Sequence, residues 1–238
     1  MLLTLPLKEI VVATPRARIV RFDLNGQDFD YLPGQAVMVG VPGTAKRPYS
    51  IAAPPEETRR SGWIELLVGV AADGTLGRHL PLEVGQAVDI EGPVGSFTFP
   101  ADPVERRFVF VAGGTGIAPL RAMLRRALTL RGHRIGVFYS ARTPDEFAYE
   151  SELRLLATTG RMELRQTCTR TVDDSWAGAR GRIGRDELRA LLHVPEGMLC
   201  FVCGPPAFVA EMSGHLAELG VERSAIRTEA WGEPLRGS

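Results

Sequence analysis

The 238-residue sequence has little of what marks secreted, metal-binding or membrane proteins. It contains only three cysteines and four histidines. No apolar stretch reaches the roughly 18 residues that a bilayer span requires. Met1 to Pro6 is apolar, but this segment is too short for a signal-peptide core and has no basic leader. We therefore expect a soluble, cytoplasmic protein.

Neither sign of charge is in excess. The 28 Lys and Arg residues balance 28 Asp and Glu residues, and the sequence pI is about 6.9. A chain without a net charge has no general attraction for nucleic acid or for an anionic membrane. Neither is therefore expected as a partner.

The three cysteines are Cys168, Cys200 and Cys203, too few and too odd in number for a disulfide framework. Cys200 and Cys203 have the C-x-x-C spacing of redox pairs and half zinc sites. However, Leu199 to Cys203 has the pattern of a buried strand, in which residues three apart point to opposite faces. The histidines also lack metal-ligand spacing, so we predict reduced thiols and no metal site.

The two halves of the chain differ in pattern. Residues 8–99 contain short alternating or apolar runs separated by turn signals such as Asn25-Gly26 and Pro33-Gly34, as in an antiparallel barrel. Beyond Pro100, strand-like runs alternate with helical patterns, which favours a parallel, doubly wound sheet. We predict a two-domain β plus α/β fold, with a β-barrel in residues 1–100 and a Rossmann-like domain in residues 101–238.

The expected strands can be read from these runs. They cover residues 9–13, 18–23, 35–41, 63–70 and 87–91 in the first half, and 108–112, 135–139, 162–168 and 198–203 in the second. A helix is expected after the strand at residues 108–112. Its apolar face is formed by Leu120, Met123, Leu124, Ala127 and Leu128. The opposite face, which we expect to be solvated, carries Arg121, Arg125 and Arg126.

Three short motifs follow one another along the chain: Arg47-Pro48-Tyr49-Ser50, then Gly113-Gly114-Thr115-Gly116-Ile117-Ala118-Pro119, then Cys203-Gly204-Pro205-Pro206. In the middle motif a buried strand runs into a glycine-rich turn and a helix. Glycines allow backbone N–H groups to approach a pyrophosphate, and a helix N-terminus favours negative charge. The motif reads G-x-G-x-x-P, so an ordinary strand-to-helix turn is the alternative when it is taken alone.

The first motif combines three chemical groups that suit a flavin. Arg47 offers a planar donor fork for phosphate, Tyr49 an aromatic face for a flat ring, and Ser50 a hydroxyl. A surface arginine beside a strand tyrosine is the alternative. Because the three motifs occur in this order, together they indicate two bound nucleotides that exchange electrons.

The chain resembles the ferredoxin-NADP reductase superfamily over essentially its whole length. Besides the three motifs, the resemblance includes Gly92-Pro93-Val94-Gly95-Ser96-Phe97 and Glu229-Ala230-Trp231. It implies a six-stranded antiparallel barrel that binds FAD, with FMN as the alternative, and a Rossmann-like domain that binds the nicotinamide nucleotide.

The resemblance also implies flavin contacts. Arg47 would hold the flavin phosphate, with Pro48 beside it in the motif, while Tyr49 would pack on the flavin and Ser50 would hydrogen-bond its N5 atom. Val68 would line the adenine side. The pyrophosphate-binding stretch corresponds to Gly74, Thr75, Leu76 and Gly77. Gly77 stands where the family usually has serine, which removes a hydroxyl donor.

For the nicotinamide nucleotide, the implied contacts come from the middle and last motifs: Gly114, Thr115, Gly116, Pro119, Cys203, Gly204 and Pro205. Cys203 would approach the reactive carbon, Glu229 would serve proton traffic, and Trp231 would shield the ring. The candidates for holding a 2′-phosphate are Ser140, Arg142, Thr169 and Arg170. Because a bidentate arginine suits a phosphate, we favour NADPH, with NADH as the alternative.

The resemblance implies an NAD(P)H-dependent flavoprotein reductase in which Ser50, Cys203 and Glu229 are the catalytic residues. Electrons would pass from NADPH through FAD to a one-electron carrier such as ferredoxin or flavodoxin. One alternative is the reductase or electron-transfer subunit of a multicomponent oxygenase or a larger redox complex. A non-enzymatic nucleotide-binding module is the third.

Overall fold

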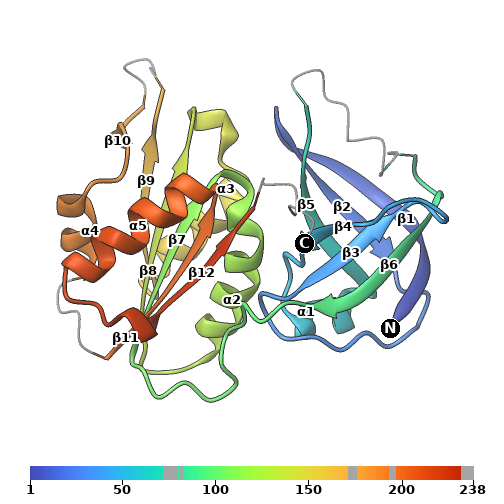
Figure 1. Cartoon of the computed structure of the whole chain (residues 1–238), viewed down its shortest axis with the longest axis horizontal. Helices are drawn as coiled ribbons and strands as arrows, with labels where there is room; N and C mark the ends of the chain where they lie inside the picture. The colour runs from blue at the N-terminus through green and yellow to red at the C-terminus, as the bar shows by residue number, and fades with distance from the viewer. Residues whose placement is uncertain (72–79, 81–82, 171–175, 193–196, 232–238) are drawn as a thin grey trace, which may run out of the picture.

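The computed structural model describes residues 1–71, 80, 83–170, 176–192 and 197–231. An antiparallel β-barrel and a parallel α/β sheet lie side by side (Figure 1). None of the helices in these ranges has both the length and the apolar character that a membrane span requires.

The barrel consists of six antiparallel strands: β1 (Leu2–Thr14), β2 (Ala17–Asp23), β3 (Ala36–Gly40), β4 (Arg47–Ser50), β5 (Trp63–Gly69) and β6 (Ala87–Val94). Their order in the sheet is β4-β3-β6-β1-β2-β5. The two outer strands approach each other, because Ile51 and Leu66 form an antiparallel bridge and Ala52 N donates to Glu65 O at 2.8 Å. Alternate side chains of all six strands fill one core, as expected from the sequence pattern.

The second half is a six-stranded parallel sheet: β7 (Arg107–Gly113), β8 (Arg134–Ala141), β9 (Glu163–Cys168), β10 (Ala179–Arg180), β11 (Met198–Gly204) and β12 (Ile226–Ala230). The order β10-β9-β8-β7-β11-β12 reverses between β7 and β11. Four helices cover the sheet: α2 (Ile117–Thr129), α3 (Glu150–Thr158), α4 (Arg185–Leu192) and α5 (Pro206–Glu218). Residues of α2 and α3 pack in one core cluster, and those of α4 and α5 in another. The predicted fold class is confirmed.

One helix and two strands were not predicted, and the two-residue strand β10 is one of these strands. Pro54-Pro55 is the start of a helix, α1 (Pro55–Ser61), because proline suits the first helical position. Acidic residues in its first turn and basic residues in its last match the helix dipole, and Gly62 ends it with φ 77°. The strand β12 was also missed, since its sequence Ile-Arg-Thr-Glu-Ala is mostly polar. β12 is an edge strand with partly exposed faces, which explains this composition.

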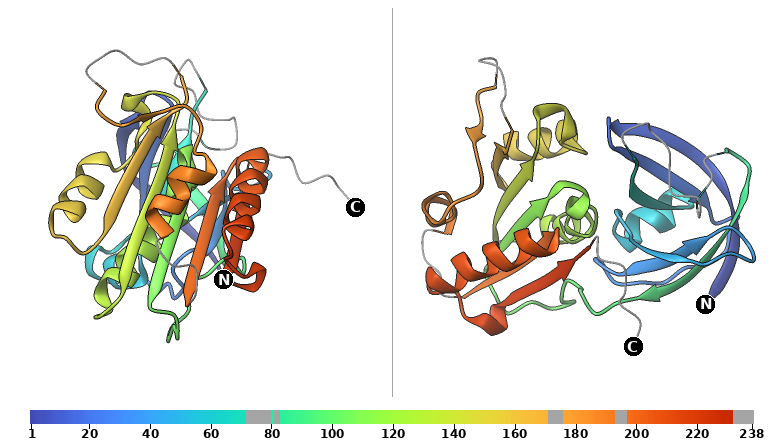
Figure 2. Two further views of the ribbon diagram at one scale, coloured as in Figure 1. Left: turned by 90° about the vertical axis from the view of Figure 1, so that its left-hand side faces the viewer. Right: turned by 45° about the horizontal axis from the view of Figure 1, so that its top comes forward.

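The prediction of a solvated arginine face on α2 is wrong for Arg121. Figure 2 shows α2 between the parallel sheet and the barrel, so its second face is covered as well. Arg121 is only 5% exposed and contacts both halves of the protein. Arg125 and Arg126 pair with Glu57 and Glu56 of α1. Periodicity identifies one packed face of a helix, but it does not identify a second face that packs against a distant part of the chain.

The segment that leaves the barrel contributes to the core of the α/β half. Phe99 packs edge-on to Phe108 with ring centroids 4.9 Å apart, and it lies 5.7 Å from the ring of Phe201. Phe97 lies 6.0 Å from Phe201. Arg227 Nη1 of β12 donates to Thr98 O at 2.8 Å. The connection is therefore packed onto the second sheet.

We predict that Phe99→Ala lowers the free energy of unfolding by about 3–5 kcal/mol, because it leaves a cavity among three aromatic rings. Urea unfolding followed by circular dichroism measures the change. Val104→Ala is the control, since Val104 lies in the same connection but is 88% exposed, and its change should stay within about 0.5 kcal/mol. Equal stability of the two variants would contradict the prediction.

Candidate active site at the domain boundary

Three side chains from the two halves meet at the boundary. Ser50 at the end of β4 donates through Oγ to Glu229 Oε2 of β12 at 3.2 Å. The thiol of Cys203 in β11 lies 3.9 Å from the same carboxylate oxygen. These are the three residues predicted to be catalytic, and the structure brings them into one hydrogen-bonded group. Their catalytic role stays a prediction.

The register of the sheet explains this convergence. Cys203 and Glu229 are direct neighbours on the parallel strands β11 and β12, so their side chains emerge on the same face. The turn η1 (Gly114–Gly116) packs tightly on the end of β11, where a Cβ atom at Gly116 would lie 2.3 Å from Cys203 O. Only glycine allows this approach, which joins the middle motif to the last one.

Cys200 and Cys203 do not form a pair. Cys200 lies in the core cluster with α4 and α5, whereas Cys203 lies in the cluster on the opposite face with α2. The alternation of a buried strand, which was the sequence argument against a C-x-x-C site, is therefore observed directly.

The group formed by Ser50, Cys203 and Glu229 is poorly solvated. Burial raises the pKa of Glu229 above its ordinary 4.5, and the hydrogen bonds from Ser50 and Cys203 only partly oppose this. Burial and the nearby Glu229 carboxylate raise the pKa of Cys203 well above the usual value for a thiol. Cys203 is therefore a neutral thiol at neutral pH.

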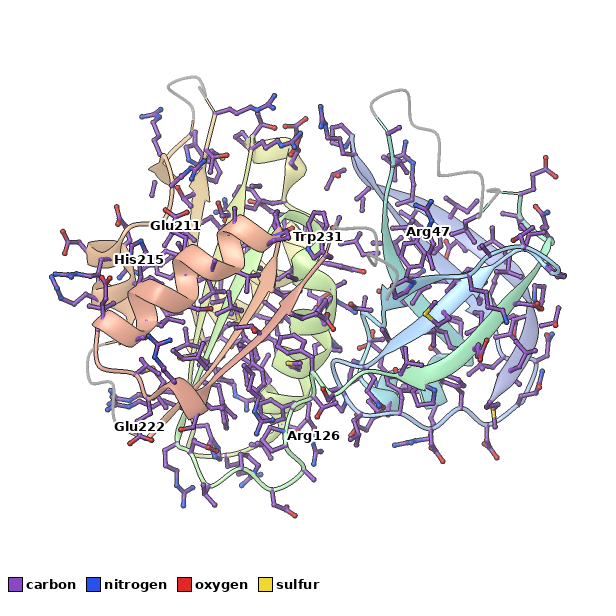
Figure 3. All side chains as sticks on the ribbon, viewed as in Figure 1. Arg47, Arg126, Glu211, His215, Glu222 and Trp231 are labelled. Carbon is purple, nitrogen blue, oxygen red and sulfur yellow. The ribbon has the colours of Figure 1, made fainter. Side chains whose placement is uncertain are left out.

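The rest of the first motif lies along β4 at the barrel surface. Arg47 and Pro48 are exposed, whereas Tyr49 is half-buried and packs against the barrel core. Burial raises the pKa of Tyr49, although the Arg47 charge lowers it. Arg47 lies on the barrel and Trp231 on the edge of the α/β half that faces it (Figure 3). A guanidinium, an aromatic ring and a hydroxyl thus follow one another toward the boundary.

A cavity of about 580 Å³ opens beside this group, at the carboxyl ends of the parallel strands. It lies at the reversal of strand order between β7 and β11, where doubly wound sheets bind their ligands. Eight residues predicted to bind the nicotinamide nucleotide line it: Gly114, Thr115, Ser140, Arg142, Thr169, Arg170, Pro205 and Trp231. The loops that carry Arg142 and Arg170 are joined, since Arg170 N donates to Arg142 O at 2.9 Å.

Other predicted residues are placed differently. Gly116, Pro119, Cys203 and Gly204 do not line the cavity, although Gly204 packs closely on Gly113 and Phe208, which do. The side chain of Val68 is fully buried in the barrel core, and the residue does not line the cavity. Gly74, Thr75, Leu76 and Gly77 lie outside the described residues.

Several residues that line the cavity were not predicted from the sequence. Arg16 of the β1–β2 turn reaches across the boundary, where its Nε atom lies 3.4 Å from Glu146 Oε1. Arg182 and Glu211 line the cavity from the α/β half. No motif marks these positions, because Arg16 meets Glu146 only when the two halves pack together, and Arg182 meets Glu211 only when the α/β half folds.

An antiparallel barrel joined to a doubly wound sheet, with a polar group and a cavity at their boundary, is the architecture of two-domain dinucleotide-dependent oxidoreductases. Two family models match the chain: an oxidoreductase FAD-binding domain over residues 4–99 and an oxidoreductase NAD-binding domain over residues 110–213. The chain belongs to the ferredoxin-NADP reductase superfamily, and it is an FAD- and NAD(P)-dependent oxidoreductase.

Individual proteins agree with this assignment. Ferredoxin-NADP reductase B of Sorangium cellulosum is 32% identical over 240 residues, covering 92% of this chain and 93% of the relative. NADH-cytochrome b5 reductase 1 of Coccidioides immitis is 26% identical over 233 residues, covering 92% and 75%. The crystal structure of the Amycolatopsis cytochrome P450 reductase GcoB superimposes with a TM-score of 0.84 at 25% identity, covering 97% of this chain and 69% of that one.

We predict that Glu229→Gln raises the melting temperature at pH 7 to 8. The folded state holds the Glu229 proton to higher pH than the unfolded chain does. The free energy of unfolding of the wild-type protein therefore falls as pH rises from about 4.5 through the raised pKa of Glu229. Glutamine keeps an acceptor for Ser50 without the charge. Differential scanning calorimetry from pH 4 to 8 measures the effect. The advantage of the variant should disappear below about pH 4.5, and a variant that is less stable at every pH would contradict the argument.

Proposed function

We propose that the protein is an NADPH-dependent flavoprotein reductase that passes electrons through FAD to a one-electron carrier protein. The observation that carries the proposal is the meeting of Ser50, Cys203 and Glu229 at the mouth between barrel and sheet, beside a dinucleotide-sized cavity. We also propose that residues 1–100 form the flavin-binding domain and residues 101–238 the NAD(P)-binding domain.

The residues of the barrel edge fit a flavin. The guanidinium of Arg47 suits its phosphate, the half-buried ring of Tyr49 offers a flat apolar surface, and the hydroxyl of Ser50 is placed to hydrogen-bond a ring nitrogen. A flavin held by these residues would supply the chemistry of hydride acceptance from a nicotinamide and of one-electron release.

The residues of the cavity fit a nicotinamide dinucleotide. Four arginines line it, Arg16, Arg142, Arg170 and Arg182, against two glutamates, which favours a ligand that carries phosphates. Gly114 has φ 55°, a left-handed conformation, and lies under the Trp231 ring, where an added Cβ would be 3.7 Å from Cζ2. Trp231 is 40% exposed and lines the cavity, where its ring would shield the nicotinamide.

The chain's own contribution to the reaction is positioning. Ser50 orients the flavin edge, Cys203 presents a neutral thiol at the end of β11, and Glu229 holds both through one carboxylate oxygen. Because burial raises the pKa of Glu229 above its ordinary value, this carboxyl keeps its proton to higher pH than an exposed glutamate, which suits a group that exchanges a proton. Most of the rate would come from holding two rings in contact in a site without water.

Three acceptor classes have support among the relatives, one of them a b-type cytochrome, because the Coccidioides relative is an NADH-cytochrome b5 reductase. The Sorangium protein, which matches over nearly the whole of both chains, is a ferredoxin-NADP reductase, and this supports a ferredoxin- or flavodoxin-type carrier. The structural match to a cytochrome P450 reductase supports the alternative of a reductase subunit in an oxygenase system. Steady-state reduction of purified ferredoxin, flavodoxin and cytochrome b5 by the same preparation discriminates between these partners.

The first test concerns the flavin and its reduction. The purified protein should be yellow, and NADPH should bleach its visible absorption under anaerobic conditions. Ser50→Ala should slow this bleaching by about two orders of magnitude, because the flavin edge loses its orientation. Stopped-flow absorption measures the rate. Ser213→Ala, which removes a hydroxyl that bonds Val209 O within α5, is the control and should keep the wild-type rate.

A colourless protein that binds no flavin would refute the proposed function. A yellow protein in which Ser50→Ala is reduced at the wild-type rate would refute only the assignment of Ser50.

The second test concerns the nucleotide. If Arg170 holds a 2′-phosphate, Arg170→Ala should lower kcat/KM for NADPH by about 10- to 100-fold, as expected for loss of a charged hydrogen bond of about 1.5–3 kcal/mol. The value for NADH should change less than about threefold. Arg154→Ala is the control, since Arg154 pairs with Glu150 on α3 outside the cavity. Equal losses with both nucleotides, or a wild-type preference for NADH, would contradict the assignment of NADPH.

A further inference from the structure

A buried cluster joins the two halves below the active site. Its centre is Arg121 of α2, whose Nη1 donates to Ala52 O at 2.7 Å and to Glu65 Oε1 at 3.2 Å. Its Nη2 atom lies 3.3 Å from Glu57 Oε1, and its Nε donates to Glu152 Oε2 at 2.9 Å. One guanidinium thus bonds four parts of the chain. In the barrel these are strand β5 and the segment that follows β4, and the other two are the helices α1 and α3.

The cluster is more than an ion pair between surfaces. The Tyr149 ring stacks on the guanidinium at 4.5 Å, and its hydroxyl donates to Glu65 Oε1 at 3.2 Å. Burial alone would lower the pKa of Arg121. Glu152 and the other nearby groups raise the pKa by more than burial lowers it, so the net shift is upward and the guanidinium stays charged. Tyr149 adopts φ 59°, which residues other than glycine rarely do. The backbone is therefore strained at the residue whose ring packs on Arg121.

Two members of the cluster, Ala52 and Arg121, are close in sequence to residues that form or support the active site. Ala52, whose carbonyl accepts from Arg121, is two residues after Ser50. Arg121 lies in the first turns of α2, five residues after Gly116, whose close approach to Cys203 fixes the helix against β11. Arg121 therefore links the Ser50 segment to the turn that supports Cys203 through one side chain.

From this geometry we infer that Arg121 is a positioning residue for the reaction: it fixes the distance between Ser50 on the barrel and Cys203 and Glu229 on the α/β sheet. The inference rests on the proposed function. Lysine should not replace Arg121, because a single ammonium group lacks the planar fork of donors that reaches a backbone carbonyl and three carboxylates at once. A misplacement of about 1 Å between reacting groups can slow a reaction by about 100-fold.

The test uses Arg121→Lys in the flavin-loaded, full-length protein. Stopped-flow reduction by NADPH should slow at least about tenfold, while the dissociation constant of the oxidised nucleotide should stay within about threefold, since no cavity residue changes. Hydrogen exchange of the peptide 47–53 should become faster without nucleotide present. Arg126→Gln is the matched control, because Arg126 lies on the same helix and pairs with α1 at 3.5 Å without contacting residues 50–52. It should behave as wild type.

The outcomes separate the two proposals. Wild-type protein that NADPH does not reduce would refute the proposed function, whereas the exchange comparison still decides whether Arg121 holds residues 47–53. A folded Arg121→Lys variant with the wild-type reduction rate, or with unchanged exchange in this peptide, would overturn the inference. Should Arg121→Lys fail to fold, Tyr149→Phe decides, since it removes only the hydroxyl on Glu65. Slower reduction and faster exchange would support the inference, and wild-type values would overturn it.

Discussion

One buried guanidinium holds the two halves of this protein together. Arg121 is placed among three carboxylates, a backbone carbonyl and an aromatic ring, with almost no contact to water. An uncompensated buried charge costs about 3–5 kcal/mol, which is a large part of the 5–15 kcal/mol that stabilises a typical domain. The two halves therefore satisfy this cluster only in one relative orientation. The position of the active site depends on that orientation, because each half supplies part of it.

The boundary contains two contrasting environments. Around Glu229 the surroundings are partly dry, since the residue is half-buried, and the pKa of the carboxyl is raised. A short distance away, the cavity has four arginines in its wall. In the proposed function, this contrast orients a dinucleotide: its phosphates are attracted to the arginines, and its uncharged ring is left for the dry end. The same barrel edge presents Tyr49 and Ser50 to the second ring.

Local patterns were sufficient to predict much of the fold. Phe108 to Ala112 is a fully apolar run before a glycine turn, and it forms the predicted buried strand β7. The middle and last motifs contribute Gly114, Thr115 and Pro205 to one cavity, because strands in a parallel sheet end at the same edge. Arg121 and Arg16 could not be placed, since their partners come from the other half of the chain. The helix α1 was missed for a different reason: Pro54-Pro55 signals a turn and a helix start equally well.

The aromatic connection has a consequence for how such proteins exchange modules in evolution. Phe97 and Phe99 precede the proposed boundary at residue 100, yet their rings lie in the core of the α/β half. A gene fusion that joined a foreign barrel at that boundary would lose the rings of Phe97 and Phe99. Phe201 and its neighbours would then be exposed to solvent. Recombination is therefore best tolerated where the crossover lies upstream of Phe97, because Phe97 and Phe99 then stay on the same gene segment as the sheet that they cover.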